Sequence, residues 1–366
     1  MATGWLVHEL YMWHSTGASA GVFPAGLTVE PGTHSENAST KRRFRNLLEV
    51  AGLEDQLTRI KPRPASEAEL ARFHTPDYIR FIKELSDKGG GDTGHLTPFG
   101  AGSYEIACLA AGGTIAAVEA VLEGRVRNAY ALVRPPGHHA ERDRGMGFCL
   151  FGNVAVAVMQ ARARHKVGRV ATVDWDVHHG NGTEQAFYEE GEVLTISLHQ
   201  DRLFPTDKGG VKDNGAGKGE GANINIPLPP GSGVGAYIAA FERVVLPALR
   251  RFKPELIVVP SGFDAGGNDS LGRMMMTSRG YAQLTRLLMD AADELCGGRL
   301  VLSHEGGYSP DHVPYCGLAV MEELSGIRTG VEDPWLAIME QWGQQALQPH
   351  QEAAIAEAAA LVKRIR

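Results

Sequence analysis

Cysteine is scarce in this sequence, and its four copies form no recognisable motif. Cys108, Cys149, Cys296 and Cys316 are scattered among 366 residues, and none belongs to a C-x-x-C pair. Such pairs are typical of zinc ribbons, while small disulfide-bonded domains use cysteine densely. The spacing argues against both classes and favours a protein of a reducing compartment, for which we expect a cytoplasmic location.

Positive charge is also in short supply. Lysine and arginine together number 36 against 43 aspartates and glutamates, which gives a formal net charge of −7. A protein without a basic surface field binds nucleic acid poorly, so we expect no nucleic-acid partner, while cationic substrates are mildly favoured. The stretch Met1–Val7 lacks the basic start of a signal peptide, and no apolar run is expected to approach the length of a membrane span. We therefore expect no membrane partner.

Short apolar runs rich in β-branched residues recur along the chain. Each run ends where polar and glycine-rich sequence begins, as Arg169–Val173 does before Asp174. Such runs are typical of buried parallel strands, and open α/β sheets carry their ligand sites at the carboxyl ends of such strands. We therefore expect separate segments to converge on one pocket. The predicted strands cover residues 129–133, 169–173, 193–198, 256–261 and 299–303.

Helical patterns alternate with these strands. Ser66 and Glu69 have the spacing of a capping box, Thr75-Pro76 is a typical helix start, and Pro247 is expected to kink its helix. The alternation predicts an α/β fold in which a mainly parallel sheet carries helices on both faces. With no repeat and no linker, residues 1–366 are expected to form a single domain. The other predicted helices cover residues 103–124, 153–165, 234–252, 278–296 and 351–365.

A long loop is predicted over Phe204–Ala222, which is rich in glycine, lysine and aspartate. One interpretation is a mobile excursion over the surface, as is common for long loops. The other is that the loop forms part of the pocket rim, because it closely follows a strand end.

Two acidic residues and two histidines follow the strand that ends at Val173. In an extended segment residues i and i+2 point to the same side, so Asp176 and His178 can bind one metal ion while Val177 faces the core. Asp264, at the end of another strand, offers a third ligand. Two aspartates and one histidine leave a coordination position open, which is typical of a catalytic zinc site. A hydrogen-bonded polar cluster is the alternative.

Two further segments supply candidate catalytic groups. A rigid Pro-Pro-Gly turn precedes His138 and His139, so one imidazole can act as a general base on a metal-bound water. Two glycines precede Tyr308 and allow its phenol to approach a substrate carbonyl, where it would stabilise an oxyanion. Surface histidines in a turn and a buried tyrosine are the alternative interpretations.

Asp174 is better placed to support the site than to bind the metal. It lies at the strand terminus, where it could orient a histidine. Ser197 and Leu198 lie at another strand end. Together with Asp174, and with Asp176 and His178, they are expected to offer oxygens to a monovalent cation, taken to be a structural potassium ion.

Motifs along most of the chain, to about Ser325, resemble the histone deacetylase superfamily, in particular the class II-like bacterial histone deacetylase-like amidohydrolases. The resemblance implies an arginase/deacetylase-like fold, one zinc ion per chain and hydrolysis of N-acyl amines such as acetyl-lysine. The motifs occur in family order: Arg-Pro-Pro-Gly-His-His (134–139), Gly-Met-Gly-Phe-Cys (145–149), Asp-Trp-Asp-Val-His-His-Gly-Asn-Gly-Thr (174–183), Ile-Ser-Leu-His (196–199), Ser-Gly-Phe-Asp-Ala (261–265) and Glu-Gly-Gly-Tyr (305–308).

The resemblance also implies roles for individual residues. Asp176, His178 and Asp264 match the zinc ligands. His138 and His139 match the paired catalytic histidines, with His139 as general base and later acid, and Tyr308 matches the phenol that polarises the scissile carbonyl. The remaining matches are Phe148, Phe204 and Leu271 in the wall of an acyl-lysine tunnel and Asp92 as a carboxylate at its rim.

Asn181 departs from the pattern of some family members, which have aspartate there to support the second histidine. An uncharged amide stabilises an imidazolium less than a carboxylate does. We therefore expect His139 to be less basic in this protein, with the pH profile altered and the activity retained.

Three alternatives stay open. The first is an acetylpolyamine amidohydrolase, for which the net negative charge and Asp92 are suitable. The second is a binuclear manganese ureohydrolase, which needs bridging carboxylates beyond Asp264. The third is a non-catalytic acyl-lysine reader, which the complete set of metal, histidine and tyrosine positions argues against.

Members of this branch are often homo-oligomers, so we also expect a homo-oligomer, with the terminal helices as possible interfaces.

Overall fold

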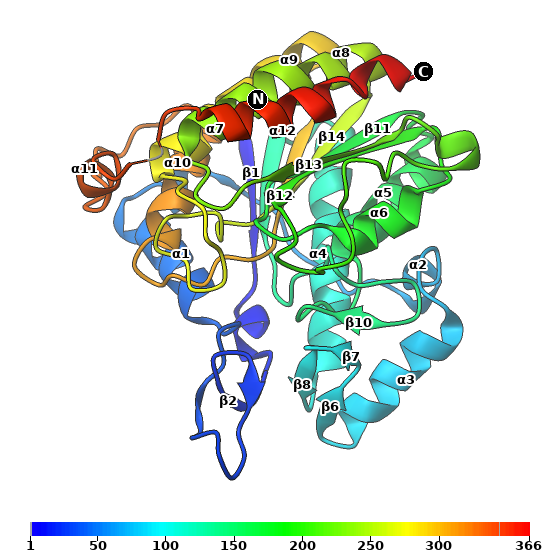
Figure 1. Ribbon diagram of the computed structural model, residues 1–366. Helices are drawn as coiled ribbons and strands as arrows, with labels where there is room; N and C mark the ends of the chain where they lie inside the picture. The colour runs from blue at the N-terminus through cyan, green and yellow to red at the C-terminus, as the bar shows by residue number, and fades with distance from the viewer. Residues whose placement is uncertain (1, 344) are drawn as a thin grey trace.

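An eight-stranded sheet forms the centre of the protein, with helices on both of its faces (Figure 1). The computed structural model describes residues 2–343 and 345–366. Neighbouring strands of the sheet are all parallel, so the predicted α/β fold is confirmed. In spatial order the strands are β13 (Asn223–Leu228), β12 (Val193–Gln200), β11 (Val170–Asp174), β14 (Leu256–Ser261), β15 (Leu300–His304), β9 (Asn128–Leu132), β1 (Thr3–Val7) and β5 (Thr58–Arg59).

The five strands predicted from the sequence are neighbours in the sheet, from β12 through β11, β14 and β15 to β9. Their carboxyl ends therefore meet at one edge, where ligand sites of open α/β sheets lie. The sequence did not predict β1, β5 or β13. Strand β13 lies at the edge of the sheet, and it mixes asparagines with Pro227 instead of forming a continuous apolar run. Proline is tolerated there because an edge strand leaves some amide positions without a sheet partner.

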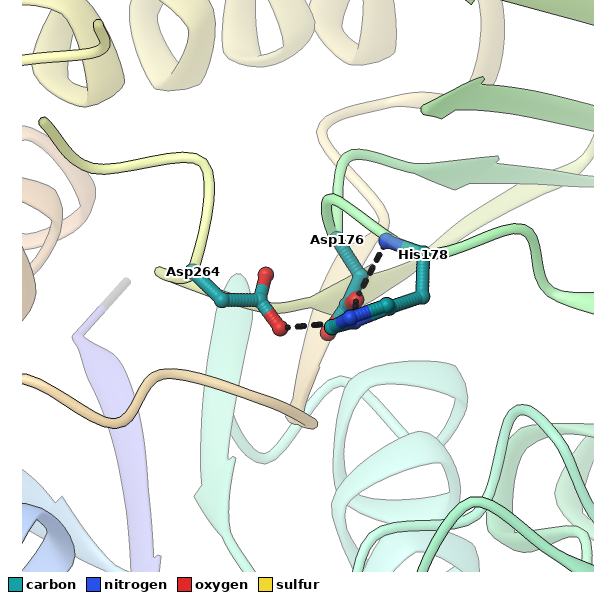
Figure 2. Close-up of side chains that lie close together, drawn as sticks. All are labelled: Asp176, His178 and Asp264. Carbon is teal, nitrogen blue, oxygen red and sulfur yellow. Dashed lines mark hydrogen bonds and ion pairs between the residues drawn. The ribbon is translucent and has the colours of Figure 1, made fainter. Parts of the chain in front are cut away.

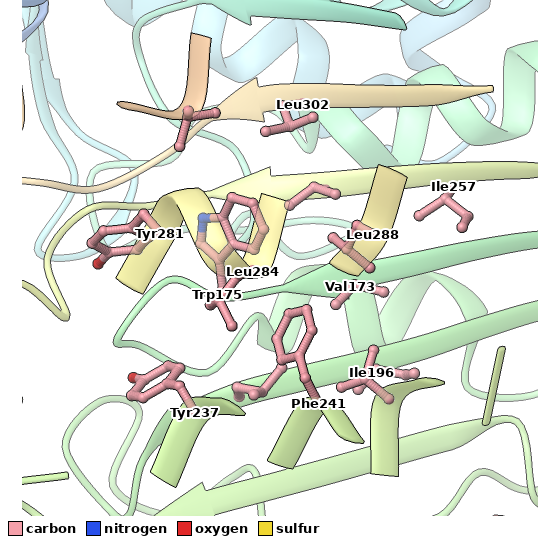
Figure 3. Packing of buried hydrophobic residues seen from close by; sticks show 14 of the residues in the cluster. Val173, Trp175, Ile196, Tyr237, Phe241, Ile257, Tyr281, Leu284, Leu288 and Leu302 are labelled. Atoms are coloured by element: carbon pink, nitrogen blue, oxygen red, sulfur yellow. The ribbon is translucent and has the colours of Figure 1, made fainter. Parts of the chain in front are cut away.

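Successive side chains of strand β9 enter different hydrophobic cores. On β9, Tyr130 and Leu132 belong to one core, and Ala129 and Ala131 belong to the other. The first core also takes in side chains of α1, α7, α8, α9, α10 and α12, and Figure 3 shows part of it. The second core takes in side chains of α3, α4 and α5. All four cysteines are buried and free, in agreement with the absence of a cysteine motif.

The helices agree closely with the sequence patterns in most places. The Ser66–Glu69 capping box is formed at α2, and Thr75 caps α3. The helices are α1 (Ser39–Val50), α2 (Glu67–Leu70), α3 (Pro76–Asp87), α4 (Ser103–Leu122), α5 (Asn153–His165), α6 (Asn181–Phe187), α7 (Val234–Ala240), α8 (Leu246–Phe252), α9 (Ser278–Cys296), α10 (Val313–Ser325), α11 (Leu336–Met339) and α12 (Pro349–Ala359).

Two predicted helices differ in detail from the observed ones. The helix predicted over 234–252 is divided into α7 and α8 by a π-helical turn, Phe241–Val245, which lies just before Pro247. Proline lacks an amide hydrogen, so helical hydrogen bonding is disturbed near it. The helix predicted over 351–365 begins earlier and ends at Ala359, and a short 3₁₀ turn follows at Val362–Arg364.

Helix α4 corrects the expectation that no apolar run approaches the length of a membrane span. Its residues, Ser103–Leu122, are long and apolar enough by length and composition to cross a membrane. Most of the helix is buried within the protein, where it packs against α5 and β9. A helix surrounded by protein is apolar on all sides. Burial in the core therefore accounts for its composition.

Within residues 2–343 and 345–366, three small sheets lie outside the central one. One of them pairs β7 (Gly94–His95) with β10 (Gly145–Met146), so the segment after α3 lies beside the segment that carries Phe148. The others join β6 (Gly90–Asp92) to β8 (Pro98–Gly100), and join β2 (Ala18–Ala20) to β3 (Phe23–Pro24) and β4 (Gly32–Thr33).

Candidate metal centre and active site

Asp176, His178 and Asp264 come together at the carboxyl edge of the sheet (Figure 2). Each offers a ligand atom within 4.8 Å of the other two, and all three residues are buried. The Nδ1 atom of His178 lies 3.1 Å from Asp176 Oδ1 and 3.1 Å from Asp264 Oδ2. Side chains from the ends of β11 and β14 therefore form a group that can bind a metal ion, as the sequence predicted.

Backbone amides hold the two carboxylates in place. Val177 N donates to Asp264 Oδ1 at 2.8 Å, and Gly306 N donates to Asp176 Oδ2 at 2.8 Å. A Cβ atom at position 306 would lie 2.0 Å from Asp264 Oδ2, so only glycine allows this approach. The Gly-Gly pair before Tyr308 thus has a second use that the sequence did not reveal.

The charges of this group favour a bound cation. Burial and the Asp176 carboxylate raise the pKa of Asp264 to about 7. Burial alone would lower the pKa of His178, but hydrogen bonds to Asp176 and Asp264 outweigh it and raise this pKa to about 10. Without metal, a proton on His178 therefore balances the carboxylates, and a divalent ion can take its place. Carboxylate oxygens and an imidazole nitrogen form a donor set that suits Zn²⁺.

His138 and His139 lie side by side, with ring centroids 4.0 Å apart, but they have different partners. His138 Nδ1 lies 2.9 Å from Asp174 Oδ2, so Asp174 orients a histidine as expected. His139 Nδ1 lies 2.7 Å from Asn181 Oδ1. The structure therefore pairs one histidine with a carboxylate and the other with an amide.

These partners separate the pKa values of the two histidines. Burial lowers the pKa of His138, but the carboxylates of Asp176 and Asp174 outweigh burial and raise it to about 10. Burial and the neighbouring His138 and His178 hold the pKa of His139 well below its usual value. His139 is therefore the uncharged histidine that can accept a proton. The hydrogen bond to Asn181 itself raises this pKa, so the reduced basicity expected from an amide in place of a carboxylate stays a prediction.

Tyr308 lies where the backbone turns sharply after β15. Its amide donates to Asp269 Oδ2 at 2.7 Å, and its ring meets the ring of Phe148 edge to face, with 5.9 Å between centroids. Lys41 Nζ lies 5.4 Å from the centre of the Tyr308 ring. Burial and the carboxylates of Asp264 and Asp176 raise the pKa of the phenol, so it stays protonated and can donate a hydrogen bond.

Phe204 is the second aromatic residue of the predicted tunnel wall. Its ring meets the ring of His139 edge to face at 5.0 Å and stacks on His95 at 5.7 Å. A Cβ atom at Gly147, where φ is +53°, would lie 2.4 Å from His139 Cδ2 and 2.9 Å from Phe204 Cε1. The first part of the loop 204–222 therefore borders the site, which supports its interpretation as a rim.

The hydrogen bonds of Asp92 and Leu271 are to nearby residues of their own segments, so their predicted places at the rim and in the tunnel wall stay predictions. Asp92 is exposed on β6, and its carboxylate accepts hydrogen bonds from the amides of Gly94 and Thr97. Leu271 is half-buried and donates its amide to Asp269. Parallel pairing of β11 with β12 places Asp174 opposite Ser197, which precedes Leu198.

Two groups of buried ionisable side chains were not predicted from the sequence. Glu305 Oε2 accepts hydrogen bonds from Gly137 N at 2.6 Å and from His138 N at 3.0 Å, and thereby fixes the turn that carries the paired histidines. Arg134 Nε and Lys41 Nζ lie 2.8 and 3.2 Å from Glu36 Oε1, with all three side chains buried. Glu305 and Arg134 belong to motifs that the sequence displays, but their partners lie far away along the chain.

Comparison with known proteins identifies the family. A model of the histone deacetylase domain matches residues 34–324. The histone deacetylase-like amidohydrolase of Pseudomonas aeruginosa is 50% identical over 335 residues, which cover 91% of this chain and 88% of that protein. A probable deacetylase of Archaeoglobus fulgidus is 36% identical over 329 residues, covering 89% of this chain and 87% of that one. The chain therefore belongs to the histone deacetylase family.

Two further relatives bear on structure and substrate. The crystal structure of the HDA15 HD domain superposes with a TM-score of 0.86 at 31% identity, covering 99% of this chain and 95% of that one. The human protein named polyamine deacetylase HDAC10 is 39% identical over 272 residues, covering 71% of this chain and 40% of that protein. Fold and family together show that the protein is a hydrolase of amide bonds.

Replacing Asp264 by asparagine tests the metal group. Asparagine keeps the shape of the side chain but loses its charge, so we expect affinity for a divalent ion to fall by about ten-fold or more. Metal content after equilibrium dialysis, measured by mass spectrometry, should be one ion per wild-type chain and less in Asp264→Asn. Asp201→Asn, an exposed aspartate elsewhere, is the matched control. Two manganese ions per chain would instead support the binuclear ureohydrolase alternative.

Proposed function

We propose that the protein is a zinc-dependent deacylase that hydrolyses N-acyl amines such as Nε-acetyl-lysine. The observation that carries the proposal is the buried Asp176–His178–Asp264 group beside a histidine of low pKa. Zn²⁺ bound by these residues would act as a Lewis acid on the acyl carbonyl and would lower the pKa of a water molecule. The donor set suits this ion and leaves a position for substrate.

His139 acts as the general base in this proposal and then as the general acid. Asn181 Oδ1 holds its Nδ1, which leaves Nε2 to take a proton from the attacking water. The same nitrogen then returns the proton to the leaving amine. His138 keeps its own proton beside Asp174, because its pKa is raised to about 10. The neutral ring of His139 thus transfers the proton, while the ring of His138 stays charged.

The hydroxyl of Tyr308 donates a hydrogen bond to the acyl oxygen, where negative charge develops as the carbonyl is attacked. Its raised pKa keeps the proton on the phenol for this purpose. Phe148 and Phe204, which contact Tyr308 and His139, line the path of the methylene chain that carries the amide. Aromatic side chains there exclude water and favour an extended aliphatic substrate.

Tyr308→Phe tests the phenol. We expect the variant to keep its metal and to lose about 100- to 1,000-fold in kcat, because one hydrogen-bond donor to the developing charge is gone. Steady-state kinetics and metal content of the same preparation measure both effects. Tyr315→Phe, on α10, is the matched control. A kcat near the wild-type value would refute the role given to Tyr308.

The second candidate function is deacetylation of polyamines by the same chemistry. It is favoured by the net charge of −7 and by the similarity to a protein named polyamine deacetylase. A panel of acetyl-lysine peptides, acetylspermidine and acetylputrescine, varied in acyl length, separates the two. We expect the highest kcat/KM for acetyl-lysine peptides, and a preference for acetylpolyamines would reverse the order of the two proposals. If the zinc-loaded protein hydrolyses none of them, the non-catalytic reader is favoured.

A structural potassium ion stays a proposal. It is supported by the pairing of β11 with β12, which brings Asp174 next to Ser197 and Leu198 at one end of the sheet. Potassium bound there should raise the midpoint of thermal unfolding relative to sodium at the same ionic strength. Equal midpoints in the two salts would contradict this site.

The single catalytic domain over 1–366 and the homo-oligomer also stay proposals. The central sheet draws strands from Thr3 to His304, in support of one domain. Light scattering at enzyme concentration tests the oligomeric state, and a monomeric mass would contradict it.

A further inference from the structure

Asn181 is the middle member of a buried chain of hydrogen bonds that leads away from His139. On one side its Oδ1 lies 2.7 Å from His139 Nδ1, and on the other its Nδ2 donates to Glu141 Oε1 at 2.9 Å. Beyond Asn181, Glu141 Oε1 also accepts a hydrogen bond from Lys208 at 2.6 Å, and Oε2 accepts one from Arg144 at 2.8 Å. The contact with Arg144 spans only three residues, whereas the other links join residues that are 40 or more positions apart in the chain.

The direction of these hydrogen bonds follows from the chemistry of the side chains. An ionised carboxylate only accepts hydrogen bonds, whereas an asparagine amide donates through its nitrogen and accepts through its oxygen. Glu141 therefore turns Nδ2 of Asn181 towards itself, which leaves Oδ1 facing His139. An acceptor at that place requires a proton on Nδ1 of His139, so the lone pair of this ring is on Nε2.

Glu141 is ionised and held firmly in its position. Its side chain is 6% exposed, and it comes directly after the segment that carries the two histidines. Burial would raise its pKa, but hydrogen bonds from Lys208 and Asn181 outweigh burial and hold the pKa below its usual value. Lys208 lies on the loop 204–222, so the same contact also ties this loop to the support of His139.

We propose that Glu141 is a positioning residue for the reaction, because it fixes the orientation of Asn181 and thereby the tautomer of His139 that can accept a proton on Nε2. Position 181 carries an amide and not a carboxylate. The carboxylate of Glu141 therefore acts on His139 through the side chain of Asn181, which lies between them. This inference rests on the proposed role of His139 as general base.

A double-mutant cycle between positions 141 and 181 tests this arrangement. Glu141→Met removes the charged acceptor and leaves Nδ2 of Asn181 only the longer contacts to His139 O at 3.3 Å and Met146 Sδ at 3.4 Å, so the amide is held less firmly in its orientation. Asn181→Asp places a second carboxylate about 3 Å from that of Glu141, where two like charges cannot both be accommodated. In Glu141→Met/Asn181→Asp the new carboxylate accepts directly from His139 Nδ1 and has no opposing charge. Each single change is therefore harmful, and the pair together is not.

We expect each single variant to lower kcat by about 10- to 100-fold, as is typical when a supporting partner is lost, with KM changed by less than about two-fold. The double variant should recover to within a few-fold of wild type. Glu141→Gln, which keeps an acceptor oxygen, should lose less than Glu141→Met. Glu123→Met, an exposed glutamate paired with Arg125, is the matched control and should keep the wild-type kcat.

The tautomer is measured independently of turnover. In zinc-loaded protein with ¹⁵N-labelled histidine, the ring signals of His139, assigned by their loss in His139→Ala, should show a proton on Nδ1 alone. Glu141→Met should shift them towards a mixture of tautomers, and the double variant should restore the first pattern. This readout remains informative if no acyl substrate is hydrolysed, so failure of the proposed function is distinguished from failure of this inference.

Two results would overturn the inference. One is a Glu141→Met variant that folds and keeps both the wild-type kcat and the wild-type histidine signals. The other is a double variant whose loss is the product of the two single losses. If Glu141→Met does not fold, Glu141→Gln/Asn181→Asp takes its place, because glutamine can donate to the new aspartate and should likewise restore kcat.

Discussion

Four carboxyl side chains lie buried where the central strands of the sheet end, and most of the site is arranged around them. Asp174, Asp176, Asp264 and Glu305 are all at most 2% exposed. Removing a carboxylate from water costs several kcal/mol unless charges and hydrogen-bond donors compensate it. Two kinds of compensation come from the protein, namely backbone amides and histidines, and a metal ion bound by Asp176, His178 and Asp264 would supply the third.

The backbone amides are available because loops follow the strands at this edge. The amides of Gly137 and His138 approach Glu305, and the amide of Gly306 approaches Asp176. Each contact joins the end of one strand to the end of another. The hydrogen bonds to the carboxyl groups therefore also fix the positions of the loops relative to one another.

The paired histidines are neighbours in one buried site, yet their pKa values differ widely. His138 faces Asp174, whereas His139 faces the amide of Asn181, and their pKa values move in opposite directions. On the Nδ1 side of His139 the negative charge is that of Glu141, which contacts Asn181 and not the histidine ring. Lys208 and Arg144 balance this charge. An uncharged histidine and a histidine that is charged at neutral pH thus come from adjacent positions of one turn.

The sequence by itself determined the five central strands, the chemistry that follows each of them, and the metal-binding group. Continuous β-branched runs have few other structures open to them, and the spacing of Asp176 and His178 places both on one side of an extended segment. It did not predict β13, whose asparagines and Pro227 break the apolar run, or that the helix α4 is apolar over the length of a membrane span. Only the tertiary structure decided the partners of Glu305, Glu141 and Lys41, because these contacts join residues far apart in the chain or depend on the direction of a side chain. The local sequence shows which chemical groups a segment carries. Which of these groups pair in a buried site depends on which segments the fold brings together.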